Sequence, residues 1–316
     1  MSNNNIITSP DSLVTTYESR RNGFIEYALR KNRESLPFIN KARALYGKLK
    51  NETTTCHDIL SIEEIKTSLY DAAGLSVKAQ SHLSENDKRQ FLTDFINTTL
   101  LPLGSGYIDE LTYRYLLSQG DALGGKMRNI VGAMAEEKLL TSIIAQLQIT
   151  NRSFSYYLPP LKTWINSNDY LTEHLAQIKA LHWQTEGQDR TLILNAKIPY
   201  IQKNVDLVLL NQRIDIQKPA LLKSALMNKD NYVMMGELKG GIDPAGADEH
   251  WKTARTSLNR IRTTFEGVSL VFIGAAIEKA MAQEIFEQFR EGLLANVANL
   301  TDDIHVAVLC SWLTKQ

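Results

Sequence analysis

Apolar positions in the first half of the chain recur at helical spacing. Ile62, Ile65 and Leu69 form one such set, and residues three and four apart share one face of an α-helix. This pattern predicts helices from about Ser12 to Thr150. Interruptions of the helices are expected at Pro37, at Gly74 and in the loop from Pro102 to Gly106.

After about residue 185, short apolar or β-branched runs typical of strands replace this spacing. The runs are Leu192–Leu194, Val205–Leu210, Tyr232–Leu238, Val268–Ala276 and His305–Leu309. Helical stretches, Ala247–Phe265 and Glu278–Ala298, separate the last three. Strands interrupted by helices predict a mixed α/β sheet flanked by helices. The chain is therefore expected to divide into a mainly helical region, residues 1–150, and an α/β core, residues 151–316.

Composition places the chain among ordinary globular proteins. Its 316 residues suit one or two domains, and 43% are hydrophobic and 22% charged. Cys56 and Cys310 have no metal-ligand spacing, which indicates a reducing compartment without structural disulfides or a zinc site. No apolar run approaches the roughly 18 residues of a membrane span, and residues 1–10 do not resemble a signal peptide. These features predict a cytoplasmic protein that is not associated with a membrane.

Three acid-x-lysine tripeptides are the first candidates for chemistry: Glu64–Lys66, Glu136–Lys138 and Glu237–Lys239. Roughly one such tripeptide is expected by chance in a chain of this size. The first two lie in helical patterns, where side chains two residues apart diverge. The third follows a strand-like run, and residues two apart on a strand share a face. Glu237 and Lys239 are therefore the pair most able to act together.

An acid on the preceding strand strengthens this interpretation. Asp206 lies in the run Val205–Leu210, and a hairpin-like arrangement would place it beside Glu237. These two carboxylates and the backbone carbonyl of Leu238 would form an oxygen-rich site that suits Mg²⁺. Asp215 is an alternative to Asp206. A surface ion pair at a strand end is the structural alternative for Glu237 and Lys239.

The residue types suit metal-assisted phosphodiester hydrolysis. A metal would neutralise charge on the phosphate and make a bound water more acidic. Lys239 would orient or help to deprotonate that water and stabilise the developing negative charge. His250 would assist as a general base or hold a neighbouring water, although a histidine that caps or packs a helix has the same appearance in a sequence.

Basic residues offer candidate phosphate contacts. Lys252, Arg255 and Arg262 recur at helical spacing after His250, and either a solvated helix face or a helix along a phosphate backbone has this pattern. The first fifty residues also hold nine Lys or Arg and four Asp or Glu. The net charge is zero, which weighs mildly against a pure duplex binder but leaves a nuclease open, because a nuclease needs acids at its centre.

Two segments resemble a known family. Gly236–Trp251, which holds Glu237, Lys239, Asp243 and His250, resembles the catalytic segment of type II restriction endonucleases of the AvaI/BsoBI group, within the PD-(D/E)xK superfamily. Gly120–Asn129 resembles a glycine-rich, basic motif ahead of the catalytic strands in several restriction enzymes. The length and the order of helical and α/β regions agree, so the resemblance covers nearly the whole chain.

The resemblance implies a homodimer that encircles double-stranded DNA. It further implies Mg²⁺-dependent cleavage after the first C of a palindrome of the form C-Y-C-G-R-G, within a restriction–modification system. Glu237 and Lys239 carry over as catalytic residues, and His250 as an additional histidine of the active site. The expected DNA contacts are Asp243 and Lys78 to bases, and Lys126, Arg128, Lys252 and Arg255 elsewhere on the DNA. In this chain Val205, where the superfamily has proline, precedes Asp206, which leaves the choice between Asp206 and Asp215 open.

Two other functions remain open on the sequence. One is a repair or recombination nuclease of the same superfamily that recognises DNA structure. The other is a non-catalytic DNA-binding or scaffold protein that uses only the basic helices. Discrete bands from a plasmid incubated with Mg²⁺ would indicate a restriction enzyme, and a smear or branch-dependent cutting would indicate a repair nuclease. For a scaffold protein, substitution of Glu237 or Lys239 would change nothing.

Overall fold

The computed structural model describes residues 6–166 and 174–316. The chain divides into two compact units, one formed by residues 26–129 and the other by residues 1–25 and 130–316. Two long helices, α2 (Tyr17–Glu52) and α6 (Tyr107–Ile149), each contribute residues to both units. None of the helices that the structure describes is long and apolar enough to cross a membrane.

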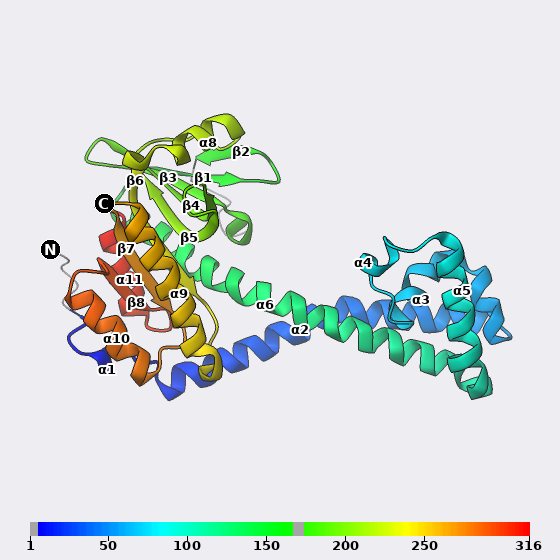
Figure 1. Ribbon diagram of the computed structural model, residues 1–316. Helices are drawn as coiled ribbons and strands as arrows, with labels where there is room; N and C mark the ends of the chain where they lie inside the picture. The colour runs from blue at the N-terminus through cyan, green and yellow to red at the C-terminus, as the bar shows by residue number, and fades with distance from the viewer. Residues whose placement is uncertain (1–5, 167–173) are drawn as a thin grey trace. The chain divides into compact units, whose positions relative to one another are not determined.

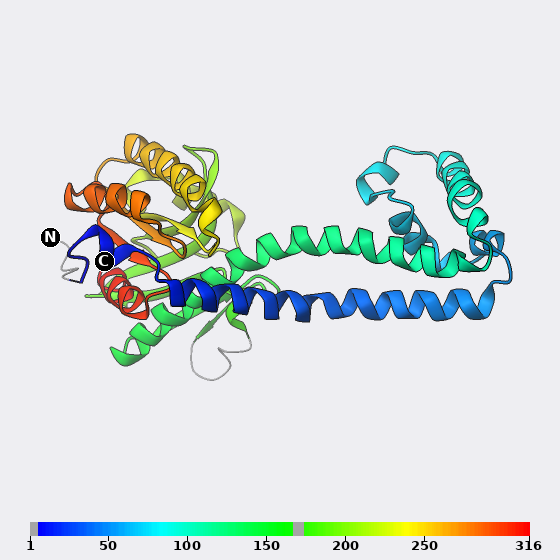
Figure 2. The same cartoon turned by 90° about the horizontal axis from the view of Figure 1, so that it is seen from below.

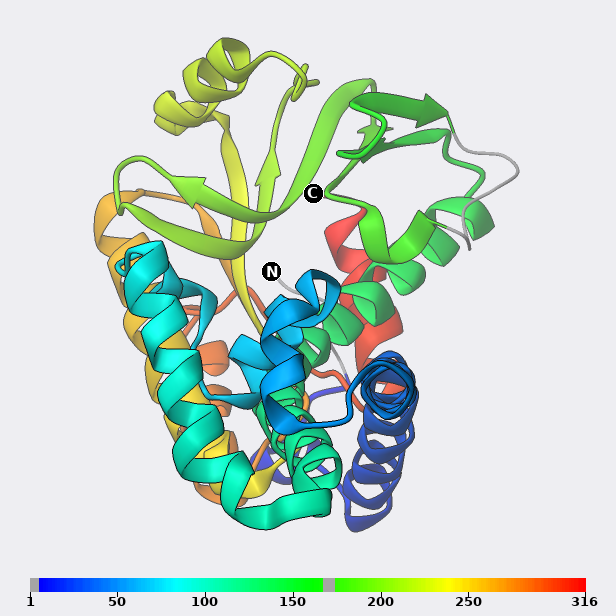
Figure 3. The same ribbon diagram turned by 90° about the vertical axis from the view of Figure 1, so that its right-hand side faces the viewer.

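The unit of residues 26–129 is built from helices. Between α2 and α6 it contains α3 (Lys66–Ala72), α4 (Val77–Gln80) and α5 (Glu85–Phe95), joined by short 3₁₀ and π turns. Figures 1 and 3 show these short helices gathered at the C-terminal end of α2 and the N-terminal end of α6. A single buried core joins them, with members that include Leu49, Leu69, Ile96 and Leu111.

The other unit is built around an eight-stranded mixed sheet with the strand order β2-β1-β3-β4-β5-β6-β7-β8. Its strands are β1 (Phe154–Leu158), β2 (Thr163–Asn166), β3 (Ala180–Thr185), β4 (Gln188–Ile198), β5 (Lys203–Leu210), β6 (Tyr232–Lys239), β7 (Ser269–Gly274) and β8 (Asn296–Asn299). Neighbouring strands are antiparallel from β2 to β6 and parallel from β6 to β8. Parallel strands need crossover connections, and these are α9 (Pro244–Thr264) and α10 (Lys279–Arg290).

Helices cover both faces of the sheet (Figure 2). One face packs against α9 and α10 together with α1 (Pro10–Leu13) and α8 (Pro219–Met227), and the other against the C-terminal part of α6 and α11 (Asp303–Leu313). Phe272 of β7 enters the first core and its neighbour Val271 enters the second. A strand buried on both faces is apolar at successive positions, which explains the continuous apolar run that predicted β7.

The predicted fold class, a mixed sheet flanked by helices with a helical N-terminal region, is confirmed. The strand predicted at His305–Leu309 is wrong, because these residues lie in α11. The buried residues of α11 lie on one side of the helix, but Ile304, Ala307 and Val308 add apolar residues on its other sides. A helix of this kind lacks a clear one-sided period, and a short apolar run cannot then be told from a strand.

Two predicted boundaries are also wrong. The helix expected over Glu278–Ala298 ends at Arg290, after which Gly292 has a φ of 76° and β8 begins at Asn296. Pro37 lies inside α2 and does not end the helix, because a proline removes one helix hydrogen bond and the many flanking turns retain theirs. The breaks at Gly74 and near Gly104, whose φ angles are 83° and 53°, are confirmed.

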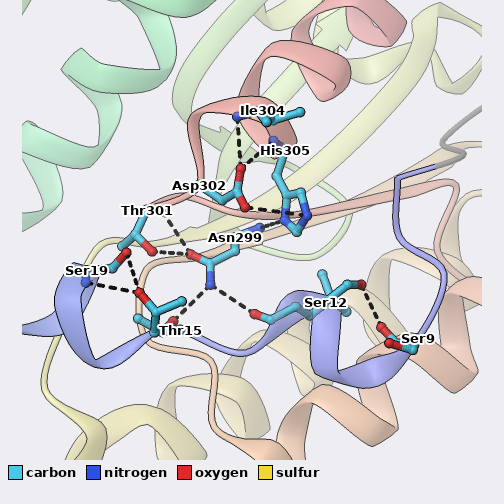
Figure 4. A network of polar contacts seen from close by, with 11 residues as sticks. Ser9, Ser12, Thr15, Ser19, Asn299, Thr301, Asp302, Ile304 and His305 are labelled. Atoms are coloured by element: carbon cyan, nitrogen blue, oxygen red, sulfur yellow. Dashed lines mark hydrogen bonds and ion pairs between the residues drawn. The ribbon is translucent and has the colours of Figure 1, made fainter.

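A buried polar network ties the N-terminal segment to the ends of β7 and β8 (Figure 4). The side-chain amide of Asn299 donates to the Leu13 carbonyl at 2.9 Å and to the Thr15 hydroxyl at 3.0 Å. The same hydroxyl donates to the Ala275 carbonyl at 2.8 Å. The backbone N–H of Ala275 in turn donates to the carbonyl of Lys239 at 2.8 Å. The network thus reaches the end of the strand that carries the predicted catalytic pair.

Candidate active site

The pairing of β5 with β6 brings the predicted acids together. The two strands are antiparallel, with Leu207 opposite Gly236, so Asp206 and Glu237 occupy the next positions along the two strands. β6 continues beyond this point through its parallel pairing with β7, in which Glu237 lies opposite Phe272. The candidate site therefore forms on β6 where its pairing with β5 ends while its pairing with β7, on the other edge of the strand, continues.

Lys239 joins the two carboxylates. Its Nζ lies 2.6 Å from Oε2 of Glu237 and 3.0 Å from Oδ2 of Asp206. The backbone N–H of Leu238 also donates to Oδ2 of Asp206, at 2.8 Å. Glu237 and Lys239 share a strand face, as predicted from their spacing, and Asp206 completes the cluster from the neighbouring strand.

Burial sets the electrostatics of this cluster. Glu237 is only 4% exposed. Its burial and the nearby charge of Asp206 raise its pKa, and contacts with Lys239 and Ser257 only partly offset this. Burial alone would lower the pKa of Lys239, but the charges of Glu237 and Asp206 outweigh burial and raise it. In the free protein Lys239 is therefore an ammonium that balances the acids.

The backbone carbonyl of Leu238 points to the same side as Asp206. The N–H and C=O of one strand residue share a side of the strand, and the Leu238 N–H faces Asp206. The carbonyl of Lys239 points to the other side, where it accepts from Ala275. Because successive carbonyls of β6 point to opposite sides, the Leu238 carbonyl adds a third oxygen-bearing group beside the two carboxylates.

Asp206, and not its rival Asp215, contacts the predicted pair of Glu237 and Lys239. Asp206 lies within β5, whereas Asp215 follows the end of that strand and pairs with Lys218 at 3.1 Å. The contacts to Lys239 and Leu238 come from Asp206. Of the two acids that the sequence left open, Asp206 is therefore the one that lies with Glu237 and Lys239, although Val205 stands where the superfamily has proline.

His250 and Asp243 lie at the start of α9. Asp243 is the N-cap residue of this helix, and its Oδ1 accepts from the Ala245 N–H at 2.9 Å. His250 is exposed, and its ring lies against Gly241, where a Cβ atom would come within 2.8 Å of Cε1. Gly241 is two residues beyond Lys239, so the absence of a side chain there lets His250 approach the end of β6.

Comparisons with known proteins agree with this geometry. A family model described as restriction endonuclease BsobI matches residues 3–316. The chain belongs to the BsobI restriction endonuclease family. It is 43% identical over 310 residues to the type II restriction enzyme AvaI of Nostoc sp., with 97% of each chain covered. It is 45% identical over 318 residues to the type II restriction enzyme BsoBI of Geobacillus stearothermophilus, with 98% of this chain and 97% of the relative covered.

These matches confirm the predicted family and enzyme class, a type II restriction endonuclease that acts on DNA. Sequence reasoning nevertheless missed two residues of its candidate site. The hydroxyl of Ser257 on α9 donates to Oε1 of Glu237 at 2.6 Å. Glu136 on α6 lies 3.6 Å from Lys179, and its pKa is raised by burial and further by the charge of Asp206.

Different signals could have located these two residues. Glu136 begins one of the acid-x-lysine tripeptides that were set aside as helical, and it is indeed helical. Its approach to Asp206 depends on packing of α6 against the sheet and not on the tripeptide. Ser257 follows His250 by seven residues, or two helical turns, which is the only sequence signal that it shares a side of α9 with that histidine.

The predicted DNA contacts of this restriction endonuclease are divided between the two units. On α9, Lys252 pairs with Asp248 at 2.5 Å and Arg255 with Glu284 at 2.6 Å. In the unit of residues 26–129, Lys78 is exposed on the short helix α4. The glycine-rich segment Gly120–Asn129 lies inside α6 and carries Arg128 and Lys126, which pairs with Glu34 at 2.8 Å.

Proposed function

We propose that this restriction endonuclease cleaves double-stranded DNA at palindromes of the form C-Y-C-G-R-G, after the first C, with Mg²⁺ as its cofactor. The observation that supports this most is the cluster of Asp206, Glu237 and Lys239 at the junction of β5, β6 and β7. The near full-length similarity to AvaI and BsoBI supports the choice of substrate.

The residues present fit Mg²⁺. Among the residues that the structure describes, no group of three His, Cys, Asp or Glu side chains is arranged to hold a metal. Mg²⁺ is commonly bound by one or two carboxylates together with waters and substrate phosphates. Asp206, Glu237 and the Leu238 carbonyl would hold it here, with the remaining positions left to water and the DNA phosphate.

The chain's own residues divide the remaining work. When bound, Mg²⁺ supplies charge neutralisation at the attacked phosphate and a more acidic water. Lys239, kept charged by Glu237 and Asp206, orients the water and stabilises negative charge that develops on the phosphate. His250, exposed at the start of α9, accepts the proton of the attacking water as a general base.

DNA recognition would use residues of both units. Asp243 retains a carboxylate oxygen beyond its helix cap and is suited to accept from cytosine N4, and Lys78 is suited to donate to guanine. Lys252, Arg255, Lys126 and Arg128 would contact the DNA backbone, three of them by exchanging an acidic partner for phosphate. A homodimer that encircles the duplex accounts for a palindromic site, because two-fold protein symmetry matches two-fold DNA symmetry.

The test is digestion of a plasmid that contains one C-Y-C-G-R-G site, with and without Mg²⁺, followed by sequencing of the cleaved ends. We expect discrete fragments whose ends map after the first C, and none from Glu237→Ala. A smear or branch-dependent cutting would indicate the repair or recombination nuclease instead. Sedimentation of the protein with and without a duplex oligonucleotide tests the homodimer separately.

A further inference from the structure

Ser257 holds the second oxygen of the Glu237 carboxylate. Its hydroxyl lies 2.6 Å from Oε1, and Lys239 Nζ lies 2.6 Å from Oε2. The two donors come from different elements, since Ser257 belongs to α9 and Lys239 to β6. Each oxygen of Glu237 is therefore fixed by its own partner.

Packing makes the position of Ser257 well defined. Its neighbours along the same side of α9, Ala254 and Ile261, are buried in the core beneath the helix. The helix is capped by Asp243, and the indole N–H of the buried Trp251 donates to Glu284 of α10 at 2.8 Å. These contacts fix α9 over the sheet, so the serine hydroxyl is presented to Glu237 by a rigid element.

We propose that Ser257 is a positioning residue that orients the Glu237 carboxylate for Mg²⁺. This inference rests on the proposed function, in which Glu237 is a metal ligand. The last torsion of a glutamate side chain is soft, so a carboxylate held only by Lys239 can turn about its terminal bond. A second donor at Oε1 fixes the plane of the carboxylate and thus the direction of its lone pairs.

The chemical nature of the donor supports this role. A second lysine or arginine at this position would add positive charge beside a cation site and repel the metal. A serine hydroxyl is neutral and donates one hydrogen bond, so it orients Glu237 without offsetting the charge of Asp206 and Glu237. Groups that hold metal ligands in this way typically change metal affinity or activity by about 10–100-fold when removed.

The experiment is a calorimetric titration of Ca²⁺ into the full-length protein bound to a duplex that contains its site. The variants are Ser257→Ala, which removes the hydroxyl, and Ser257→Thr, which retains it. Thr256→Ala is the matched control, because that hydroxyl is exposed and donates to the Lys252 carbonyl of its own helix at 2.8 Å. Glu237→Ala is included to test the metal site itself.

We expect Ser257→Ala to weaken Ca²⁺ binding about tenfold, and Ser257→Thr and Thr256→Ala to bind as the unchanged protein does. Ser257→Ala should also need about tenfold more Mg²⁺ for half-maximal cleavage, at a similar maximal rate. Unchanged Ca²⁺ affinity in Ser257→Ala, or an equal loss in Thr256→Ala, would overturn the positioning role. Normal Ca²⁺ binding by Glu237→Ala would instead show that the proposed metal site is wrong.

Discussion

The ammonium of Lys239 lies 2.6 Å from the carboxylate of Glu237, which precedes it by two residues on the same strand. The same ammonium lies 3.0 Å from the carboxylate of Asp206. Among the three acid-x-lysine tripeptides of this chain, this pair is in a strand, and the other two lie in helical segments. The strand is what makes a common tripeptide into a shared site, since both side chains project from one face.

Replacing Lys239 with alanine is expected to slow cleavage by at least about 100-fold. A loss of this size is usual when one donor to a reacting group is removed. DNA binding should largely survive, because Lys239 acts at the phosphate that is cut. Single-turnover cleavage and gel-shift binding measure the two effects. Lys66→Ala is the control, since Lys66 belongs to a helical acid-x-lysine tripeptide and forms an exposed pair with Glu63 at 3.4 Å. Equal losses in both variants would count against the site.

Asp206→Asn is expected to slow cleavage by at least about 100-fold, as Lys239→Ala does. Asp215→Asn is expected to leave the rate within about twofold of normal. Asp206 contacts Lys239 and Leu238, whereas Asp215 pairs with Lys218 beyond the strand. The measurement is the single-turnover rate at saturating Mg²⁺. A greater loss in Asp215→Asn would reverse the assignment of the first metal ligand.

His250→Ala is expected to slow cleavage by about 10²–10⁴-fold, the usual contribution of a general base, with DNA affinity retained. His250 is exposed beside Gly241, at the end of the catalytic strand. His57→Ala is a suitable control, because His57 is exposed and bonds to Asn97 at 2.9 Å in the other unit. If His250→Ala cuts at the normal rate, another group accepts the proton.

Strand periodicity was sufficient to predict the centre of this site. The apolar runs around Asp206 and Glu237 located β5 and β6, and the two strands pair as predicted although α8 and a 3₁₀ turn lie between them in the chain. Ser257 could not be predicted in the same way, because its contact depends on how a crossover helix lies on the sheet. A serine in an amphipathic helix has no local feature that indicates which strand residue it will meet.

The wrong strand at His305–Leu309 has a local cause instead. His305–Leu309 is apolar enough for a strand, and only the cap supplied by Asp302, which accepts from the N–H groups of Ile304 and His305, distinguishes it as the start of a helix. The acidic partners of Lys252 and Arg255 also differ in whether the sequence alone could predict them. Asp248 lies four residues away on the same helix and was accessible to the sequence, whereas Glu284 comes from α10.

Mild acid is expected to destabilise the fold through His305. This side chain is 3% exposed, and its Nδ1 accepts from the backbone N–H of Asn299 at 3.4 Å (Figure 4). Burial lowers its pKa, and Asp302 only partly offsets this. In the unfolded chain His305 therefore binds a proton near pH 6.5, whereas in the folded protein it binds one only at a lower pH. The contribution of neutral His305 to stability is complete above pH 6.5 and is lost as the pH falls below it.

Denaturant unfolding at pH 7.5 and 5.5 measures this loss. His305→Gln, which cannot titrate, should lose less stability between the two values than the unchanged protein. A smaller loss will persist in the variant, because burial also lowers the pKa of His182. Identical pH dependence in the variant and the unchanged protein would show that His305 does not contribute.

Gly240→Ala is expected to destabilise the protein by about 1–3 kcal/mol, the usual cost of overpacking, and to slow cleavage. A Cβ atom at this position would lie 2.5 Å from Cβ of Ala135 and 2.8 Å from the Val131 carbonyl, both on α6. The strain would fall on the residue next to Lys239 and displace its ammonium, to which we assign a catalytic role. Gly132→Ala is the matched control, as Gly132 is exposed on the same helix.

In the described part of the chain, outside the backbone of α6 itself, a Cβ atom at position 132 would meet no heavy atom within 4 Å. Gly132→Ala should therefore stabilise the protein by up to about 1 kcal/mol, because alanine favours a helix over glycine. If α6 packs directly against the end of β6, the change in unfolding free energy has opposite signs in the two variants. Cleavage should then be slower in Gly240→Ala and unchanged in Gly132→Ala. Equal stabilities would show that the strand end can move away from α6 at no cost.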